Sequence, residues 1–201
     1  MSRLILFQSV MYARGGEGEG GLDGPAMRDA ALAAARCVEA MHKVDLVWTD
    51  IKPENCIVTT DSIGCDGDCP LVVKGIDLES AIPRGDTPVD YSPEASPPEF
   101  AVDFVEGRAL DHELDFSYDV WSLGMLLYEL STGRGYFGEE SPDNITRMLS
   151  EPGFKVDLRN VKRNRLRNLI GQCLQTDPKK RPSINEVLLH PYFLTTGLGW
   201  Y

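Results

Sequence analysis

The spacing of apolar residues along the chain predicts a mainly helical protein. The most regular pattern is an i, i+3, i+4, i+7, i+8 stripe, which indicates one buried helix face and is formed by Leu166, Leu169, Ile170, Cys173 and Leu174. The segment from Ser117 to Thr132 is apolar around most of its helical circumference and is followed by Gly133. We therefore expect it to be a helix buried in the middle of the domain.

Three further helices are predicted from start and stop signals. Ser141 and Pro142 can start a short helix, and Ser183 with Glu186 forms a capping-box pattern for a last helix that the pair His190-Pro191 ends. Pro25 suits the first turn of an earlier helix that runs to about Lys43. Its apolar side chains fall roughly on one face: Met27, Leu32, Ala35, Val38 and Met41.

Short β-like segments lie between the first helix and the central one. They cover residues 46–48, 56–59 and 71–74, and they enclose two polar connections. Residues 82–98 are rich in proline and lack apolar periodicity, which predicts an irregular and largely exposed segment. The predicted fold class is therefore α+β, mainly helical, with a small β element beside the first polar connection.

Composition and charge restrict the class of protein. A chain of 201 residues with 42% hydrophobic residues is long enough for one soluble domain with a substantial core. The net charge of −11, with no sustained basic stripe, argues against nucleic acid or an anionic membrane as a partner. Five irregularly spaced cysteines indicate free thiols, and no signal peptide or membrane span is evident. We expect a cytoplasmic or nuclear protein.

The polar run of residues 49–55 is the first candidate for chemistry. A carboxylate at Asp50, an ammonium at Lys52 and a carboxamide at Asn55 can converge, because Pro53 stiffens the connection between them. A carboxylate can accept a proton from an attacking hydroxyl, an ammonium can neutralise phosphate, and an amide oxygen is a hard ligand for Mg²⁺. The alternative for such a string taken alone is an ordinary polar hairpin turn.

Six motifs in order resemble the large lobe of protein kinases of the serine/threonine type. The string DIKPEN looks like the family's catalytic loop, and the match covers nearly the whole chain. The remaining strings resemble, in turn, the helix and strand before that loop, the metal-binding DFG turn, the APE motif, the buried central helix and the closing helices: AARCVEAMHKVDLVW, VVKGIDLESA, SPPEF, DVWSLGMLLYELSTG and DPKKRPSINEVLLHPYF.

The resemblance implies a role for each matching residue. Asp50 would be the catalytic base for the substrate hydroxyl, and Lys52 would steady the transferred phosphoryl group. Asn55 and Asp77 would hold Mg²⁺ on the phosphates of ATP, so ATP and Mg²⁺ are the implied cofactors. A protein would be the substrate or partner.

Three other matching residues are implied to be structural. Glu99 matches the APE glutamate and would form a buried ion pair with Arg181. TPVDYSPE also resembles the approach to this motif, which would make Glu94 the paired residue, but Glu99 is followed by apolar residues that can begin a buried turn. Asp119, at the head of the central helix, would brace the catalytic loop through its backbone.

The sequence departs from the family pattern around both catalytic segments. The family's HRD motif reads Trp48-Thr49-Asp50 here. In the family, the arginine of this motif can pair with a phosphorylated activation segment, so Thr49 argues against that mode of regulation. The DFG turn reads Asp77-Leu78-Glu79, where Glu79 either binds a second cation or restricts the turn. In the family, the HRD histidine and the DFG phenylalanine stack in one apolar column. Trp48 is larger than histidine and Leu78 is smaller than phenylalanine, so we expect their volumes to compensate and Trp48→His alone to destabilise the domain.

Two further segments are ambiguous. Thr87, Ser92 and Ser96, each followed by proline, are candidate phosphorylation sites or simply residues of an exposed loop. Cys65 and Cys69 flank two aspartates, but two thiols do not complete a tetrahedral zinc site, which favours a hairpin tip.

The expected domain organisation is a large lobe without its small lobe. Residues 1–16 resemble a remnant of the small lobe's last strand and linker, and residues 17–201 resemble the large lobe. Neither a glycine-rich phosphate loop nor a strand lysine precedes the catalytic loop, so we expect little activity from this chain alone unless missing sequence supplies that lobe. The alternatives are a pseudokinase or interaction module and, more remotely, an unrelated metal-dependent hydrolase.

Overall fold

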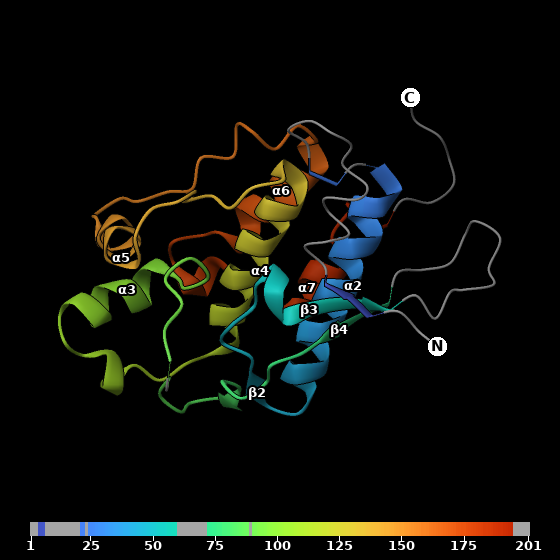
Figure 1. Cartoon of the computed structure of the whole chain (residues 1–201). Coiled ribbons are helices and arrows are strands. Elements are labelled where there is room, and N and C mark those ends of the chain that lie inside the picture. Colours follow the sequence, from blue (N-terminus) through green and yellow to red (C-terminus); the bar gives the residue numbers. More distant parts are fainter. Residues whose placement is uncertain (1–3, 7–20, 23, 60–71, 89, 195–201) are drawn as a thin grey trace.

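A single buried helix, α4 (Phe116–Thr132), forms the centre of the fold (Figure 1). The computed structural model describes residues 4–6, 21–22, 24–59, 72–88 and 90–194. Most side chains of α4 are buried, which confirms the prediction made from its apolar circumference. The Asp115 carboxylate accepts a hydrogen bond from the first helical amide, and Gly133 ends the helix with a left-handed φ of 79°.

Helices from both ends of the chain pack around α4. Helix α2 (Gly24–Lys43) contacts α4 and α7 (Ile184–Leu188), and α6 (Asn164–Cys173) also packs against α4. The buried face of α2 is built largely from small residues, which allow close helix packing: Met27, Ala30, Ala31, Ala34, Ala35 and Val38. The predicted positions of these three helices are thus confirmed, and the capping box of Ser183 and Glu186 is present at α7.

Two small antiparallel sheets lie beside the helices. In the three-stranded sheet, β3 (Cys56–Thr59) lies between β1 (Leu4–Leu6) and β4 (Val72–Gly75). The two-stranded sheet pairs β2 (Leu46–Val47) with β5 (Ile82–Pro83). The three predicted strand segments are confirmed, whereas β5 was not foreseen because its two residues include a proline.

The proline-rich segment of residues 82–98 is less exposed than its sequence predicts. Pro88, Pro93 and residues 95–98 are buried. The segment ends at α3 (Pro98–Val105), which packs against α5 (Pro142–Ser150) on the left of Figure 1. The expectation of a largely exposed loop was wrong because several of the prolines pack against the domain. Ser96, which lies among them, is only 1% exposed.

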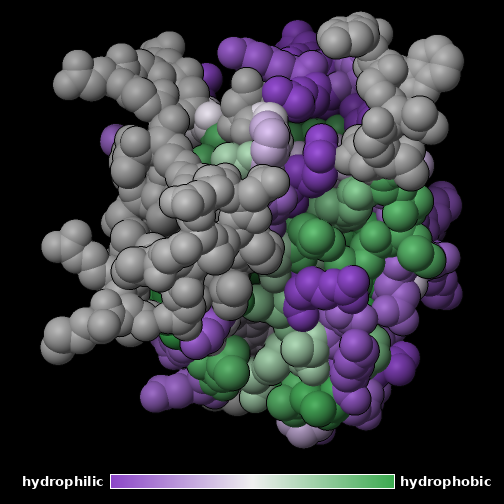
Figure 2. Space-filling model, turned by 90° about the vertical axis from the view of Figure 1, so that its right-hand side faces the viewer, coloured by the Kyte–Doolittle hydropathy of each residue, from purple (hydrophilic) through white to green (hydrophobic). Residues whose placement is uncertain are grey.

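Three short 3₁₀ helices complete the described secondary structure: η1 (Pro53–Asn55), η2 (Ala109–Asp111) and η3 (Pro178–Lys180). In Figure 2, seen from the side on which α2 and the β3–β4 hairpin lie, hydrophobic side chains gather in a patch bordered by hydrophilic ones. No helix in the described ranges is long and apolar enough to cross a membrane. The Cys65 and Cys69 loop and the predicted boundary between residues 16 and 17 lie outside the described residues.

Candidate active site

The polar run between β2 and β3 brings together the three groups predicted from its sequence. The Lys52 ammonium lies 2.9 Å from Asp50 Oδ2, and the Asn55 amide nitrogen donates to the same carboxylate oxygen at 2.6 Å. The amide nitrogen also donates to the Asp50 backbone carbonyl at 2.9 Å. The η1 turn, with Pro53 in its first position, folds the chain back so that these contacts form over five residues.

The two Asp50 carboxylate oxygens are in different environments. Oδ2 accepts both contacts described above, whereas buried Oδ1 has no hydrogen-bond partner within the described part of the chain. A buried acceptor without a donor is costly unless a ligand supplies one. The Asp50 side chain as a whole is 20% exposed, so a substrate hydroxyl would approach the carboxylate where it reaches the surface and not at buried Oδ1.

The charge of Lys52 is stabilised by its surroundings. Burial is the largest influence and lowers its pKa, but the hydrogen bond and charge of Asp50, with the charges of Glu94 and Glu54, outweigh it and leave the pKa raised. Lys52 is therefore a permanent ammonium at neutral pH, which is the form that can neutralise phosphate.

Asp119 holds the start of the loop from the central helix. Its Oδ2 accepts from the Trp48 backbone amide at 2.8 Å, and its Oδ1 accepts from the Thr49 amide at 3.0 Å. His42 Nε2 lies 3.0 Å from Oδ2, and its ring stacks on Phe116 at 4.1 Å between ring centroids. Because Asp119 is fully buried, this network fixes the backbone directly before Asp50.

The β3–β4 hairpin places Asn55 close to the segment that carries Asp77. Cys56 pairs with Gly75, and one residue further the Ile76 amide donates to the Asn55 carbonyl at 2.8 Å. Asp77 is exposed and has a left-handed φ of 57°. Because the amide nitrogen of Asn55 already bonds Asp50, its amide oxygen is the group left to face a cation.

This donor set fits Mg²⁺ held together with nucleotide phosphates. Within the described residues, no three His, Cys, Asp or Glu side chains form a cluster suited to a metal ion. Mg²⁺ prefers oxygen ligands and usually keeps waters and substrate phosphates in its coordination shell, so Asn55 and Asp77 are the residues that would hold it.

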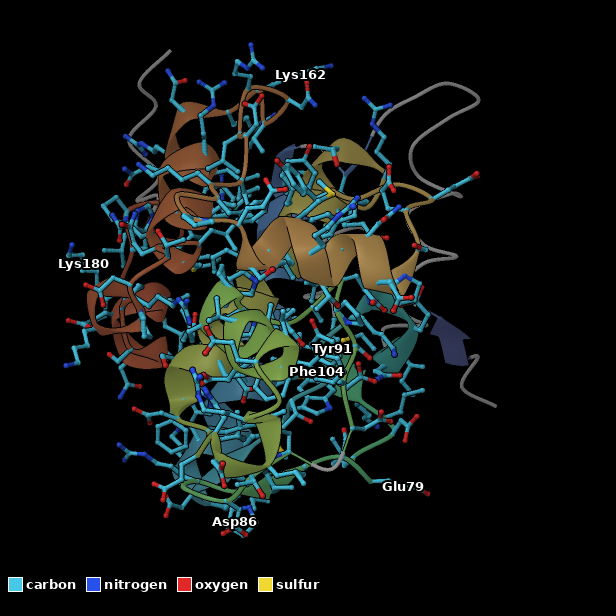
Figure 3. The ribbon with its side chains drawn as sticks, turned by 90° about the vertical axis from the view of Figure 1, so that its left-hand side faces the viewer. Glu79, Asp86, Tyr91, Phe104, Lys162 and Lys180 are labelled. Atoms are coloured by element: carbon cyan, nitrogen blue, oxygen red, sulfur yellow. The ribbon has the colours of Figure 1, made fainter. Side chains whose placement is uncertain are left out.

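The expected apolar column of Trp48 and Leu78 is not formed. Leu78 is 46% exposed, whereas Trp48 is 1% exposed. A Cβ added at Gly75 would lie 2.6 Å from the Trp48 ring, so the indole occupies the space that the missing side chain leaves. The large ring is therefore accommodated by a glycine on β4 and not by a smaller residue at position 78. Glu79 points outward from its turn (Figure 3).

Glu99 and Arg181 form a bidentate ion pair. The Arg181 guanidinium donates to both Glu99 carboxylate oxygens, at 2.6 and 2.7 Å. It also donates to the Ser117 carbonyl at the start of α4 and to the Gln175 carbonyl. The pair thus joins α3, α4 and the segment before η3, and it is formed by Glu99 and not by Glu94.

An acidic cavity beside the catalytic loop was missed by the sequence reasoning. It measures about 440 Å³, and its lining includes Lys52, Glu54, Glu94, Glu129 and Phe137. Burial, followed by the charges of Glu54 and Glu94, raises the pKa of Glu129 to about 7. A glutamate on the otherwise apolar face of α4 is the signal that could have identified it. A larger cavity of about 590 Å³, between the ends of α4 and α6, contains none of the predicted site residues.

Similarity to known proteins agrees with this geometry. The sequence model of the protein kinase domain matches residues 12–193. A calcium and calcium/calmodulin-dependent serine/threonine-protein kinase from Lotus japonicus is 31% identical over 158 residues, covering 77% of this chain and 28% of that protein. Aurora kinase from Saccharomyces cerevisiae is 30% identical over 181 residues, covering 86% of this chain and 43% of the relative. The chain thus spans less than half the length of either relative. It belongs to the protein kinase domain family.

Proposed function

We propose that residues 17–201 are the large lobe of a serine/threonine protein kinase that transfers the γ-phosphoryl group of Mg-ATP to a protein hydroxyl. The observation that carries the proposal is the convergence of Lys52 and Asn55 on one oxygen of Asp50, with the other oxygen without a partner among the described residues. Because phosphoryl transfer depends mainly on positioning and charge, these contacts are the relevant geometry.

Each residue has a defined task in this proposal. Asp50 orients the substrate hydroxyl and takes up its proton, while Lys52 and Asn55 hold the carboxylate in place through Oδ2. Lys52, kept charged by its acidic neighbours, faces the transferred group. Asn55 and Asp77 hold Mg²⁺, which when bound neutralises charge on the nucleotide phosphates.

A second lobe is required to cover the nucleotide, and we propose that additional sequence of the same protein supplies it. The relatives that match this chain are more than twice as long as the matched region, which supports this view. Determining the native transcript through its 5′ end tests it directly. Activity should be assayed in the longest form encoded. A cytoplasmic or nuclear location follows from the same proposal, because ATP and reduced thiols are found together there.

The acidic cavity favours a protein substrate that carries a basic segment near its acceptor residue. Three glutamates around one cavity are destabilised by mutual repulsion, and an arginine or lysine of a bound peptide would relieve it. Glu129→Gln should therefore raise the KM for a peptide carrying arginine near the acceptor serine and leave the KM for a neutral peptide unchanged. An equal change for both peptides would contradict the assignment.

The decisive experiment compares two site variants with a matched control. Asp50→Asn should keep Mg-dependent ATP binding and lower kcat by about 10²-fold or more. Asp77→Asn should lose Mg-dependent ATP binding, measured by calorimetry. The control is Asp86→Asn, an exposed residue that follows Asp77 in the chain (Figure 3), and it should change neither ATP binding nor kcat. ATP binding that Asp77→Asn leaves intact would refute the metal assignment.

A second candidate function is a pseudokinase that binds protein partners. The observation in its favour is the altered catalytic surroundings, in which Thr49 replaces an arginine and Leu78 is 46% exposed beside Asp77. An absence of both ATP binding and phosphoryl transfer in the longest encoded form would favour this function over catalysis.

A further inference from the structure

Two hydroxyl side chains connect the catalytic loop to the segment that follows Asp77. The Thr49 hydroxyl donates to the Ser80 backbone carbonyl at 3.0 Å, and the Ser80 hydroxyl donates to the Trp48 carbonyl at 3.3 Å. Both hydroxyls thus bond the backbone of the opposite segment. We name this reciprocal pair the Thr49–Ser80 bridge.

The bridge continues a strand pairing that the backbone cannot. In the β2–β5 sheet, Leu46 pairs with Pro83 and Val47 with Ile82, and the same register two residues further places Thr49 opposite Ser80. The ladder stops because Thr49 has a φ of 71°, a left-handed conformation that β-branched residues rarely adopt. Side-chain hydroxyls therefore make the cross-strand bonds beyond Val47.

The position of the bridge relates it to the candidate active site. Thr49 directly precedes Asp50, and Ser80 lies three residues after Asp77. On the opposite side, the Thr49 amide donates to buried Asp119. The bridge thus connects the segment that carries the candidate base to the one that carries the candidate metal ligand.

The surroundings of the bridge are neutral or acidic. A space of about 10 Å³ beside it is lined by Thr49, Asp50, Ser80, Asp90, Tyr91 and Ser92. It offers two carboxylates and no cationic side chain, and it is far too small for a phosphate group. A phosphate on Ser92 would meet repulsion at this point, because none of the lining residues could pair with it.

We propose that Thr49 and Ser80 are positioning residues that hold the segment of residues 77–83 against the catalytic loop by neutral hydrogen bonds, without phosphorylation. Phosphorylation of Ser92 would loosen this segment. The catalytic consequence rests on the proposed kinase function, whereas the structural consequence does not.

Hydrogen exchange of the whole chain, followed by mass spectrometry, tests the structural part. Thr49→Val keeps the shape of the side chain but removes the hydroxyl, and Thr49→Ser is the conservative control. Thr49→Val and Ser80→Ala should each speed exchange of the hydrogen-bonded amides of Ala81 and Arg84 by about 3- to 10-fold. Exchange in α6 should not change, and Thr49→Ser should resemble the wild type. Unchanged exchange at Ala81 and Arg84 in a folded Thr49→Val variant would overturn the proposal.

A phosphomimetic variant and a kinetic assay test the regulatory part. Ser92→Glu should speed exchange of the same amides, and slower exchange would contradict the proposed repulsion. In the longest active form, Thr49→Val should lower kcat with little change in the KM for ATP, Thr49→Ser should restore kcat, and phosphatase treatment should leave the wild type unchanged. If the variants show faster exchange but neither they nor the wild type are active, the structural role of the bridge stands and the proposed kinase function is refuted. Activity that Thr49→Val does not alter would overturn the positioning role.

Discussion

The Glu99–Arg181 ion pair makes the most quantitative prediction. The Arg181 side chain is completely buried, and the Glu99 side chain is 23% exposed. The guanidinium also lies over the Trp121 ring, at 5.0 Å from its centroid, and donates to the backbone carbonyls of Ser117 and Gln175. Removal of the glutamate charge would therefore leave a positive charge that cannot reach water.

The expected cost of Glu99→Gln follows from this burial. Breaking a buried ion pair by removing one partner costs about 3 to 5 kcal/mol. Because Glu99 keeps partial access to solvent, which screens its charge, we expect a value near the lower end, about 3 kcal/mol. For a chain of this size, 1 kcal/mol corresponds to a shift of about 2 to 4 °C in Tm, so Tm should fall by about 6 to 12 °C.

Urea titration and thermal unfolding of the whole chain provide the assay. Replacing both partners, as in Glu99→Leu with Arg181→Met, should recover much of the loss, because no buried charge then remains unpaired. Asp157→Asn, which breaks an exposed pair with Arg159, is the control and should leave Tm unchanged. A Tm for Glu99→Gln within 1 to 2 °C of the wild type, about the shift that 0.5 kcal/mol produces, would refute the reasoning.

Three other predictions concern packing and charge. Gly75→Ala should cost about 1 to 3 kcal/mol because its methyl would lie 2.6 Å from the Trp48 ring, and combination with Trp48→Phe should cost less than the sum in urea titrations. Trp48→His alone should lower Tm, since a smaller ring leaves part of a fully buried site empty. Burial, then nearby carboxylates, raises the pKa of Glu129 to about 7 from an ordinary 4.5, so stability should fall as pH rises between these values. With solvent screening of this half-buried carboxylate, the fall in the free energy of unfolding should be about 1 to 2 kcal/mol at pH 8. Glu129→Gln should remove this fall, which is measured by comparing Tm at pH 5 and pH 8.

The helices were predictable because their signals are local. The capping box at Ser183, the glycine that ends α4 and the apolar stripe of α6 each lie within one element, and the structure places the elements where these signals are found. The segment of residues 82–98 was misjudged because its burial depends on contacts with α3, α4 and α5, which are distant or separate elements in the sequence. Proline content predicts irregular backbone, but it does not predict exposure.

In the candidate site, too, local features were predictable from the sequence and long-range contacts were not. The approach of Asp50, Lys52 and Asn55 follows from a short turn, so their spacing in the sequence was sufficient to predict it. Pairing over long separations, as between Glu99 and Arg181, was foreseen only through the resemblance to a family. Ser80 and Glu129 were missed, because their importance arises from partners brought close by the fold.

The altered residues before Asp50 do not by themselves remove the geometry of the site. Asp119 holds the loop through the backbone amides of residues 48 and 49, and such bonds are available whatever side chains those residues carry. Trp48 is accommodated by Gly75, and the hydroxyl of Thr49 makes a cross-strand bond to Ser80. The substitutions therefore change how the loop is stabilised while Asp50 keeps its contacts with Lys52 and Asn55. Loss of the usual neighbours is consequently weak evidence against catalysis, and phosphoryl transfer from Mg-ATP is the property that separates an active kinase from a partner-binding relative.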